Sequence, residues 1–521
     1  METKIKRALI SVSDKLGLAD LARGLVDAGV EIYSTGGTRK YLLSNGIEAV
    51  EVSKYTAFPE MMHGRLKTLH PKIFGGILAR RNEPDDMQAA HDHQIAMFDL
   101  IVVNLYPFEA TISRPGVTDA EAIENIDIGG PSLVRAAAKN HQFVTIATHP
   151  EQYSEVLEQI EQNGGTTLEL RQKLAGEAFG LTAAYDRAIA DYFAQRSGKV
   201  DFPPVLTVQL HRKSELRHGE NPHQRAGLYN IVGARGVGLV TARQLNGKEL
   251  SYNNILDLDA ALGIVRAFSE PAAVVIKHNN PCGAAIGSDL ASAAQRALAG
   301  DPQSAFGGII GFNRPVDAAT AEVLATPGLF IEAIVAPEFS PEALQILTTK
   351  PKWKQNVRLM QVGAFDVPQS DRKFRHIEGG MLVQDADVLP DPESDWKLVT
   401  TAVPSDALQA DLRFAWQMVR PVKSNAIVIA KDGMLLGAGA GQMSRVDSVD
   451  IAIAKAGERV KGAVLASDAF FPFPDSIHKA AAAGIAAIIQ TGGSVKDAEV
   501  IAACNEHGLP MILTGRRHFT H

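Results

Sequence analysis

An apolar run in the middle of the chain ends in two adjacent side chains that can handle protons. Val274 to Ile276 predict the end of a buried strand, and Lys277 and His278 follow directly. The Asn, Pro and Gly residues after them predict a sharp turn. Histidine can take up a proton near neutral pH, and a lysine ammonium can stabilise a developing anion or protonate a leaving group. A surface lysine beside a structural histidine is the ordinary alternative, but the place after a buried strand favours a reactive cleft.

Hydroxyl, glycine and lysine residues near the N-terminus indicate an anion site. The segment STGGTRK (Ser34–Lys40) predicts a strand end, a Gly-Gly turn and the start of a helix. Backbone N–H groups at a helix N-terminus bind phosphate readily. The segment SVSDK (Ser11–Lys15) is expected at the end of the neighbouring strand, facing the same crevice. The pattern matches neither the P-loop nor the dinucleotide fingerprint, and a capped helix after an ordinary glycine turn is the alternative.

Three more segments place acid–base groups within reach of that crevice. They are the basic loop His63–Gly76 with Lys67, the segment Asn104–Phe108 with Tyr106, and the segment Ile126–His141 with Asp127 and Lys139. We expect strand ends to carry these Lys, Tyr and Asp side chains. Such groups are what proton transfer with loss of water requires. A solvated basic loop is the ordinary alternative for the first segment.

Two segments match metal motifs only in part. The segment LRHGENPHQ (Leu216–Gln224) has His218 and His223 five residues apart, a separation that fits no common zinc motif. Zinc deaminases carry HxE followed by PCxxC. Here Pro281 and Cys282 are followed by no second cysteine and preceded by no HxE. We therefore expect no metal in catalysis.

The composition indicates an ordinary globular protein. The 521 residues are 45% hydrophobic and 21% charged, with a formal net charge of −7, so bulk attraction to nucleic acid or anionic lipid is not expected. Only two cysteines are present, Cys282 and Cys504, which fits a reducing compartment. The N-terminus has no signal-peptide pattern, and no apolar run approaches the ~18 residues of a membrane span. The sequence thus predicts a cytoplasmic protein that binds neither membrane nor nucleic acid.

The elements that must position these residues alternate between strand and helix. Strand patterns at Arg7–Ser13 and Glu31–Gly37 are each followed by a helical pattern. Apolar runs at Phe98–Phe108 and His141–Thr148 predict further buried strands. Such alternation is typical of an α/β fold with a parallel sheet covered by helices.

The chain is expected to divide at a polar, proline-paired segment, Arg196–Val205, with a weaker break at Asp387–Asp395. The two parts on either side of the weaker break have similar outlines. The segment Ala426–Gly441 repeats the strand, turn and glycine-containing return of the Lys277 segment, and an alanine-rich helix and a second apolar strand follow each. An internal repeat and a chance likeness between two α/β units both remain open.

Taken together, these motifs make the chain resemble the family of bifunctional purine biosynthesis proteins, which combine AICAR (phosphoribosylaminoimidazolecarboxamide) formyltransferase and IMP cyclohydrolase. The likeness covers essentially the whole chain. Each motif alone is unspecific, whereas the ordered combination is highly specific. The motifs are SVSDK, STGGT, GRLKTLHP, NLYPF, DIGGPSLVRAAAKNH, LRHGENPHQ, IKHNNPCG, SAFGG, KSNAIV, GAGQMSR, SDAFFPFPDS and RRHFTH.

The resemblance implies the last two steps of de novo IMP synthesis. These are formyl transfer from the cosubstrate 10-formyltetrahydrofolate to AICAR, giving the formamido nucleotide FAICAR, and dehydrative ring closure to IMP. Residues 1–198 are expected to form a methylglyoxal-synthase-like, parallel-sheet cyclohydrolase domain. Residues 199–521 are expected to form the formyltransferase domain, two related cytidine-deaminase-like lobes without zinc that divide near residues 387–395. The family also implies a homodimer whose formyltransferase sites are shared between subunits.

The same resemblance assigns residues to the cyclohydrolase site. The nucleotide phosphate is expected on Ser11, Ser13, Lys15, Thr35, Gly36, Gly37 and Thr38. The base is expected among Arg65, Lys67, Thr68, Asn104, Tyr106, Asp127, Gly129 and Lys139. Lys67, Tyr106, Asp127 and Lys139 collectively take the proton-transfer and oxyanion roles, and the sequence does not say which residue moves which proton.

For the formyltransferase site, the resemblance makes His278 the proton acceptor, Lys277 the group that assists the folate leaving nitrogen and the oxyanion, and Asn425 a residue that orients the substrate carboxamide or His278. Substrate contacts are expected from Arg217, His218, Phe306, Gly307, Glu332 and Arg517, and folate contacts from Gln442, Pro472, Phe473 and Asp475. The chain departs from the family pattern twice: His218 replaces a common Tyr, and Glu332 stands where Asp is frequent. Both changes keep a polar group, so they put the contacts in doubt more than the function.

Two other functions fit parts of the sequence. The N-terminal fold also occurs as a regulatory module, so this half could be a nucleotide sensor; the proton-transfer set argues against that reading. A zinc nucleoside deaminase is the other alternative, and the cysteine pattern disfavours it.

Overall fold

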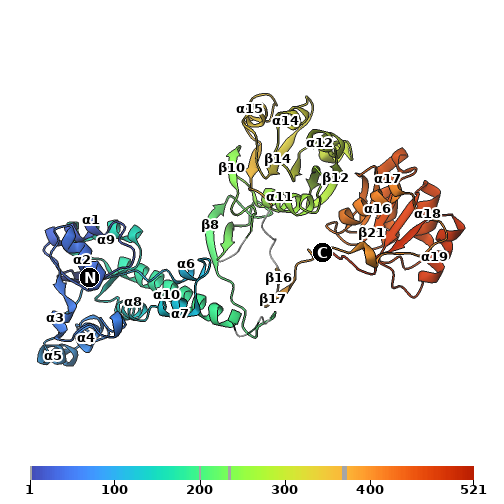
Figure 1. Ribbon diagram of the computed structural model, residues 1–521. Helices are drawn as coiled ribbons and strands as arrows, with labels where there is room; N and C mark the ends of the chain where they lie inside the picture. The colour runs from blue at the N-terminus through green and yellow to red at the C-terminus, as the bar shows by residue number, and fades with distance from the viewer. Residues whose placement is uncertain (1–2, 197, 199–200, 233–235, 366–371) are drawn as a thin grey trace. The chain divides into compact units, whose positions relative to one another are not determined.

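The computed structural model describes residues 3–196, 198, 201–232, 236–365 and 372–521. Contacts divide the chain into two compact units, unit 1 (Met1–Thr207) and unit 2 (Val208–His521). In Figure 1 the first is coloured blue to teal and the second green to red. The division falls two residues after the proline-paired segment Arg196–Val205. Within the described residues, no helix is long and apolar enough to cross a bilayer.

Unit 1 is built on a five-stranded sheet, in the order β4-β3-β2-β5-β6, in which every neighbouring pair is parallel. The strands are β2 (Arg7–Ser11), β3 (Glu31–Ser34), β4 (Val50–Glu51), β5 (Leu100–Val103) and β6 (Thr145–Ala147). All four residues of β5 are buried, as in a sheet covered on both faces. The strand order runs outward in both directions from β2. Ligands of such sheets bind at the carboxyl ends of the strands where the order reverses, here between β2 and β5.

Helices pack around this sheet in two groups, α1 against α9, and α8 against α4 and α10. Helix α1 buries Leu18, Leu21, Ala22 and Leu25, the spacing of one helix face. The helices of unit 1 and its remaining short strands are β1 (Thr3–Lys4), α1 (Leu18–Asp27), α2 (Gly36–Ser44), α3 (Val52–Thr56), η1 (Met62–Gly64), α4 (Pro71–Leu78), α5 (Pro84–Asp92), α6 (Phe108–Ile112), α7 (Asp119–Glu124), α8 (Gly129–Lys139), η2 (Pro150–Gln152), α9 (Tyr153–Asn163), β7 (Gly165–Thr166) and α10 (Leu168–Arg196).

Unit 2 contains a twelve-stranded sheet in the order β10-β15-β14-β13-β11-β12-β20-β19-β21-β22-β23-β18. Two hairpins, β8–β9 and β16–β17, stand apart from it. The elements are β8 (Leu210–Leu216), β9 (Ala226–Ile231), β10 (Arg243–Asn246), α11 (Tyr252–Val265), β11 (Ala272–Lys277), β12 (Asn280–Ile286), α12 (Leu290–Leu298), α13 (Pro302–Ala305), β13 (Gly308–Phe312), α14 (Ala318–Leu324), β14 (Ile331–Ala336), α15 (Pro341–Thr349), β15 (Arg358–Gln361), β16 (Arg372–Ile377), β17 (Gly380–Asp385), η3 (Glu393–Asp395), β18 (Lys397–Leu398), α16 (Asp406–Val419), β19 (Ile427–Lys431), β20 (Met434–Gly439), α17 (Arg445–Ala456), η4 (Gly457–Val460), β21 (Val464–Ser467), α18 (Asp475–Ala483), β22 (Ala487–Gln490), α19 (Asp497–Glu506) and β23 (Met511–Leu513).

The strand order of unit 2 shows the internal repeat. In each half an edge strand and a helix precede an antiparallel hairpin, and three further strands follow with helices between them. The hairpins are β11–β12 and β19–β20, and β12 pairs with β20 where the halves meet. The expected break, Asp387–Asp395, lies between β17 and β18, and therefore between the two copies. Lobe 1 below means β10 to β15, and lobe 2 means β18 to β23.

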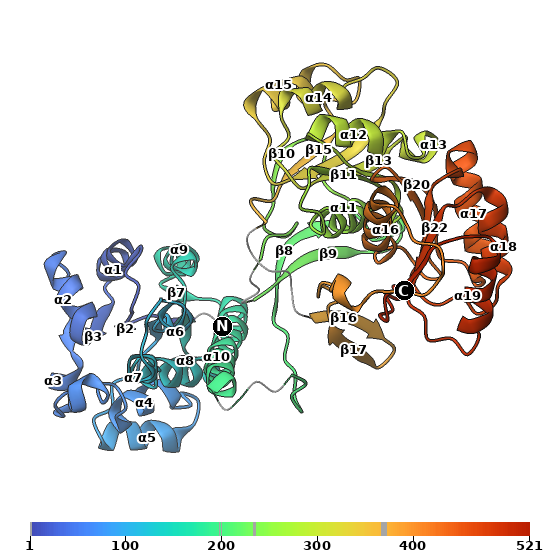
Figure 2. The same ribbon diagram turned by 45° about the vertical axis from the view of Figure 1, so that its right-hand side comes forward.

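The sheet of unit 2 is covered on both faces. Along β11, Val274 and Ile276 belong to a core that both lobes share, which also contains residues of α11 and α16, whereas Val275 belongs to a separate core with α12, α14 and α15. The second lobe has its own core under α17, α18 and α19. Figure 2 shows α16 on one side of the lobe 2 strands and α17 and α18 on the other. Burial on both faces explains why these strands read as continuous apolar runs.

The sharp turn after β11 differs from the expected one. The turn consists of His278 and Asn279, both with positive φ (51° and 62°), and Pro281 lies in the returning strand β12, where the register shifts. A proline is tolerated at such a bulge because no ladder hydrogen bond is lost. Positive φ at both central residues is typical of a type I′ hairpin, which selects the turn residues more strongly than a nearby proline does.

Candidate functional sites

The loop after β2 in unit 1 is held by hydroxyl and amide side chains at the carboxyl edge of the sheet. The Thr38 hydroxyl of α2 accepts from the Val12 amide (3.1 Å) and donates to the Val12 carbonyl (3.0 Å). After β5, Asn104 Oδ1 accepts from the Ser13 and Asp14 amides, and Asn104 Nδ2 donates to the Asp14 carbonyl (2.8 Å). The expected phosphate and base segments thus share one crevice.

The first turn of α2 lies at this crevice with unused donors. The first amides of any helix have no intrahelical partner. In α2 the N-cap residue, Thr35, makes no side-chain hydrogen bond to them either. Gly36 has φ 46°, and a side chain there would approach Lys67 Nζ at 3.6 Å. Lys15 Nζ points back to the Ser13 carbonyl at 3.1 Å. Two ammonium groups and free amides therefore border the place expected for phosphate.

Asp127 lies in a cradle of backbone amides beside Lys67. Its carboxylate accepts from the Gly130 amide at 2.8 Å, and its own amide donates to the Tyr185 hydroxyl at 2.8 Å. A side chain at Gly129 would lie 3.5 Å from the Thr68 hydroxyl, so Thr68 also borders this cradle. The structure brings Lys67, Thr68, Asp127 and Gly129 together.

Burial raises the pKa of the Asp127 carboxyl above its usual value, while the amides of Gly130, Tyr106 and Gly129 and the charge of Lys67 oppose that rise. A carboxyl group whose pKa is raised by burial is suited to taking up and returning a proton. The Lys67 ammonium also pairs with Glu60 at 3.3 Å.

Two expectations about local structure in unit 1 are wrong. Asp127 does not follow a strand: it lies between α7 and α8, because the short Ile-Asp-Ile segment joins two helices. Lys67 follows the short helix η1 and not a strand. Of the three acid–base groups expected at strand ends, only Tyr106 follows one. The loop after η1 carries Lys67 to the crevice, and the loop between α7 and α8 carries Asp127.

Two assigned residues have other surroundings in this chain. Arg65 pairs with Glu124 of α7. Lys139 ends α8, whereas Asp127 and Gly129 stand at its beginning, about 15 Å away at ~1.5 Å rise per residue. Because α8 runs back from the carboxyl edge of the sheet toward the start of β6, a single chain does not place Lys139 beside Asp127.

In unit 2, one edge of the twelve-stranded sheet gathers the formyltransferase candidates. Lys277 ends β11, and its ammonium donates to the Phe306 carbonyl at 2.8 Å. Phe306 and Gly307 precede the antiparallel strand β13, and a side chain at Gly307 would lie 3.4 Å from Lys277 Nζ. On the next strand, Glu332 pairs with the buried Arg358 at 2.5 Å. Lys277, Phe306, Gly307 and Glu332 therefore lie along one edge, and Arg358 is a neighbour that no sequence motif indicated.

Asn280 links the His278 turn to lobe 2. Its Nδ2 donates to the His278 carbonyl at 3.2 Å, and its Oδ1 accepts from the Lys423 amide at 3.2 Å. Lys423 is two residues before Asn425, so the segment that carries Asn425 in lobe 2 lies beside the turn that carries the exposed His278 in lobe 1. Asn280 lies within the motif IKHNNPCG, in which the sequence predicts only a turn for the two asparagines.

Asn425 is fixed by buried charge behind it. Its Oδ1 accepts from Arg445 at 2.9 Å, and its Nδ2 donates to the Gln442 carbonyl at 3.0 Å. Arg445 is buried and forms an ion pair with the buried Asp468. The folate candidate Gln442 is thus a direct neighbour of Asn425. Arg445 is a further site residue, contained in the motif GAGQMSR but not singled out by its chemistry.

The remaining candidates lie on the same edge or on elements that reach it. The loop with Arg217 and His218 docks on α11, where Asn253 donates to the Glu220 carbonyl at 3.2 Å. Pro472, Phe473 and Asp475 follow β21, whose end joins the start of β19 through the Asp468 amide and the Ala426 carbonyl (3.3 Å). Arg517 follows β23 and stacks on Phe519, with 4.3 Å from its guanidinium carbon to the ring centre.

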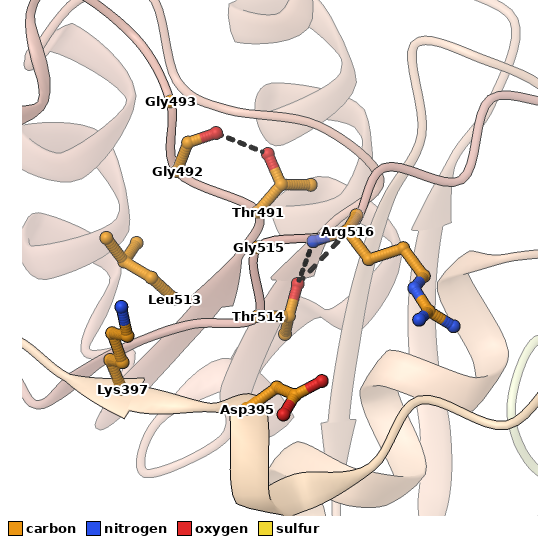
Figure 3. A pocket seen from close by; sticks show the side chains of 9 residues that line it. All are labelled: Asp395, Lys397, Thr491, Gly492, Gly493, Leu513, Thr514, Gly515 and Arg516. Atoms are coloured by element: carbon orange, nitrogen blue, oxygen red, sulfur yellow. Dashed lines mark hydrogen bonds between the residues drawn. The ribbon is translucent and has the colours of Figure 1, made fainter.

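A pocket of about 320 Å³ lies at the ends of β22 and β23 on this edge. Figure 3 shows two glycine-containing turns over it, with the Lys397 and Asp395 side chains below. Thr491, which lines the pocket, follows Gln490 in the chain. The Gln490 side chain accepts from the Phe471 amide at 2.9 Å, and Phe471 directly precedes the folate candidates Pro472 and Phe473. Sequence reasoning missed it, although Thr-Gly-Gly after a strand is the pattern noted in STGG. The lining residues are Asp395, Lys397, Thr491, Gly492, Gly493, Leu513, Thr514, Gly515 and Arg516.

Among the described residues, no group of three or more His, Cys, Asp or Glu side chains is placed to hold a metal ion. His218, one of the two histidines considered as metal ligands, has its Nδ1 2.8 Å from the Gly219 carbonyl oxygen.

Comparisons with known proteins found family models and relatives that together match nearly the full length of the chain. A family model described as AICARFT/IMPCHase bienzyme matches residues 137–455, and one described as MGS-like domain matches residues 17–132. A bifunctional purine biosynthesis protein PurH of Rhodopirellula baltica is 63% identical over 517 residues, covering 99% of both chains. The PurH of Bacillus cereus strain G9842 is 49% identical over 516 residues, covering 99% of this chain and 100% of the relative. A solved structure described as that of ForH is 34% identical, covering 37% of this chain and 100% of its own, with a TM-score of 0.35.

Proposed function

We propose, from the premise that the chain belongs to the AICARFT/IMPCHase bienzyme family, that each of the two units houses one of its reactions. The protein is a bifunctional purine biosynthesis enzyme for the last two steps of IMP synthesis, with formyltransferase and cyclohydrolase activities. Unit 2 carries formyl transfer from 10-formyltetrahydrofolate to AICAR, and unit 1 carries ring closure of FAICAR to IMP. In domain terms, this assigns residues 1–198 to cyclisation and 199–521 to formyl transfer.

Formyl transfer needs a proton acceptor because the AICAR amine is a weak nucleophile. Its lone pair is delocalised toward the carboxamide. The amine nitrogen attacks the formyl carbon, and a carbon–nitrogen bond forms there as the bond to folate N10 breaks. The amine proton passes through the substrate carboxamide to His278, and N10 gains a proton with help from Lys277, releasing tetrahydrofolate. Asn425, held by Arg445, orients the carboxamide.

Lys277 has a defined place in this scheme. Its ammonium already donates to the Phe306 carbonyl, so the side chain is held at the edge where the formyl group would lie. An ammonium there stabilises the negative charge that develops on the formyl oxygen. Arg217, Phe306, Gly307, Glu332 and Arg517 then hold AICAR, while Gln442, Pro472, Phe473 and Asp475 hold the folate. His218 is assigned to the substrate loop.

Ring closure joins the carboxamide nitrogen of FAICAR to its formyl carbon and expels water. One proton leaves the nitrogen and one reaches the carbinolamine oxygen, so no other reactant is consumed. The raised pKa of the Asp127 carboxyl suits it to move these protons, with Lys67 beside it and Tyr106 nearby. We also include Lys139 among the groups that move these protons. Because the length of α8 separates Lys139 from Asp127 in one chain, Lys139 would reach the same substrate from another copy of the chain.

The nucleotide phosphate is placed on the first turn of α2 and the loop after β2. Uncapped amides at Gly36 and Gly37 and the Lys15 ammonium supply the charge that a phosphate requires. Ser11, Ser13, Thr35 and Thr38 complete this end. Arg65, Thr68, Asn104 and Gly129 border the base. The proposed steps use no metal, and the protein is proposed to act as a homodimer with a reduced folate as its cosubstrate.

The observation that carries this proposal is the bridge by which Asn280 joins the His278 carbonyl of lobe 1 to the Lys423 amide, two residues before Asn425, on the same sheet edge. A nucleotide sensor would need the phosphate site of unit 1 but not a buried carboxyl group beside a lysine. The direct test mixes purified protein with AICAR and 10-formyltetrahydrofolate and follows tetrahydrofolate and IMP separately. Both products are expected. If tetrahydrofolate and FAICAR formed without IMP, unit 1 would have no cyclohydrolase activity. If neither tetrahydrofolate nor IMP formed, the assignment would be overturned.

A further inference from the structure

The repeat in unit 2 allows the His278 turn to be compared with a turn of the same construction. The hairpin β19–β20 turns at Asp432 and Gly433, with φ of 53° and 65°, and the hairpin β11–β12 turns at His278 and Asn279, with φ of 51° and 62°. Asp-Gly is among the favoured pairs for such turns. His-Asn is not among these pairs: His and Asn enter the left-handed region more readily than most residues with a Cβ, but the pair lacks the glycine that adopts it without cost.

The surroundings of the two turns match closely. Lys277 Nζ donates to the Phe306 carbonyl at 2.8 Å, and Lys431 Nζ donates to the Lys461 carbonyl at 3.1 Å. The glycines after those carbonyls, Gly307 and Gly462, have φ of 70° and 73°. The two turns are thus equivalent positions of one design and differ in the residues that occupy them.

A carboxylate from the preceding helix holds each turn. Asp411 of α16 accepts from the amides of Asp432 (2.9 Å) and Gly433 (2.8 Å). Asp257, at the same place in α11, accepts from the Asn279 amide at 2.7 Å. Hydrogen bonds from backbone N–H groups to a carboxylate are strong. They hold the turn amides toward the helix, a conformation that the His278–Asn279 pair would not favour unaided.

The position of the imidazole depends on this turn. The His278 side chain is exposed, so neighbouring packing does not fix it. Two hydrogen bonds fix the backbone of the turn: Asp257 accepts from the Asn279 amide, and Asn280 Nδ2 donates to the His278 carbonyl. A proton acceptor displaced by about 1 Å can lose on the order of a hundredfold in rate.

We propose that Asp257 is a positioning residue of formyl transfer, which holds the unfavoured His278–Asn279 turn in its left-handed conformation so that the imidazole meets the substrate. This inference rests on the proposed role of His278. Asp257 does not touch the reacting atoms and takes no proton. It acts on the turn, and its equivalent Asp411 does the same for a turn without a proton acceptor.

The repeat supplies the matched control. We expect Asp257→Ala in the full chain to lower kcat of formyl transfer about tenfold or more, with KM for AICAR within about threefold, because the substrate contacts remain. Asp257→Asn is expected to recover kcat to within about threefold, since its carbonyl oxygen still accepts from the Asn279 amide. Asp411→Ala is expected to lower Tm at least as much as Asp257→Ala, because it frees two amides, and yet to keep kcat within about threefold.

The Tm and the circular dichroism spectrum of every variant serve as the folding control, and cyclisation of supplied FAICAR, the reaction proposed for unit 1, is expected to be unchanged. If Asp257→Ala does not fold, the double variant Asp257→Ala/Asn279→Gly replaces it, because glycine adopts the left-handed turn without the carboxylate; it is expected to fold and to keep more activity than Asp257→Ala. A kcat within about twofold of wild type for Asp257→Ala, or an equal loss in Asp411→Ala, would overturn the inference. Unimpaired formyl transfer in His278→Ala would instead overturn the function proposed for His278.

Discussion

At the scale of single residues, Asp127 combines a functional role with a cost in stability. Burial raises the pKa of its carboxyl group in the folded chain. A folded-state pKa above the unfolded value stabilises the protein below the unfolded pKa, and that contribution is lost as pH rises through the folded pKa. At pH 7 the raised pKa of the Asp127 carboxyl group is therefore a cost to the stability of the folded chain. Asn keeps an oxygen that accepts from Gly130 and removes the charge.

Asp127→Asn is accordingly expected to show a Tm at pH 7 equal to or above that of the wild type, while cyclisation falls about 10²- to 10⁴-fold. Calorimetry at pH 7 and at pH 4, with FAICAR cyclisation at pH 7, checks both effects. The difference in Tm is expected to shrink at the lower pH. A variant several degrees less stable at pH 7 would show that the carboxylate is a structural support.

The two thiols are expected to be inert in the folded protein. Burial raises the pKa of both Cys282 and Cys504 to about 12, so the reactive thiolate is about one part in 10⁴ at pH 8. A thiol-reactive disulfide reagent should label neither cysteine in native protein at pH 8 and both in denatured protein. Rapid labelling of Cys282 in the native state would show that the strand β12 opens readily.

At the scale of elements, two equivalent glycines allow the helices of each lobe to approach the hairpins. A Cβ at Gly283 would lie 2.0 Å from the Ala297 carbonyl oxygen, and one at Gly437 would lie 2.2 Å from that of Ala452. Backbone cannot yield as a flexible side chain does. Gly283→Ala and Gly437→Ala are each expected to lower the free energy of unfolding by about 1–3 kcal/mol, as for other overpacked sites.

Gly263 provides the control for that measurement. It lies inside α11, and a Cβ there would meet no atom within 4 Å. Gly263→Ala is therefore expected to raise stability by about 0.5–1 kcal/mol through helix propensity. Urea unfolding of the three variants compares them. Equal effects at all three positions would mean that the close approach of helix and hairpin does not matter.

The sequence predicted strands well where their apolar residues were continuous. The continuous apolar runs at β5 and β11 were recognisable because both faces of these strands are buried. The prediction that Asp127 stands at a strand end is wrong, since three alternating residues between helices imitate a strand. The turn at His278 was misread because proline and asparagine signals are strong locally, whereas the hairpin needed two residues of positive φ. Arg358 carried no signal at all: its role depends on a partner, Glu332, that only the fold brings near.

At the scale of the whole molecule, the duplicated topology of unit 2 places the candidate site at one edge of one sheet. Because β11 runs antiparallel to β12, β12 to β20, and β20 to β19, the turn at His278 and the turn at Asp432 lie at opposite edges. Of these two turns, the first holds a histidine, and the segment with Asn425 of the other lobe lies beside it. The candidate site therefore depends on both copies but exists once.

The presence of both reactions in one chain has a chemical rationale. Formyl transfer to a weak amine is unfavourable or near balance, and ring closure removes its product, so cyclisation is expected to pull the first step forward. This hypothesis requires that the two sites work independently on a shared intermediate. It also requires that a change in one unit leaves the other reaction intact.

The central claim is that the two reactions belong to separate sites, and mixing two variants tests it most directly. His278→Ala is expected to cyclise supplied FAICAR at the wild-type rate but to form no tetrahydrofolate from AICAR and 10-formyltetrahydrofolate. Asp127→Asn is expected to release tetrahydrofolate and FAICAR but little IMP. Mixed in equal amounts, the two variants should form IMP from AICAR, because each supplies the step that the other lacks. Loss of both reactions in either folded variant, or a mixture that forms no IMP, would contradict the two-site account.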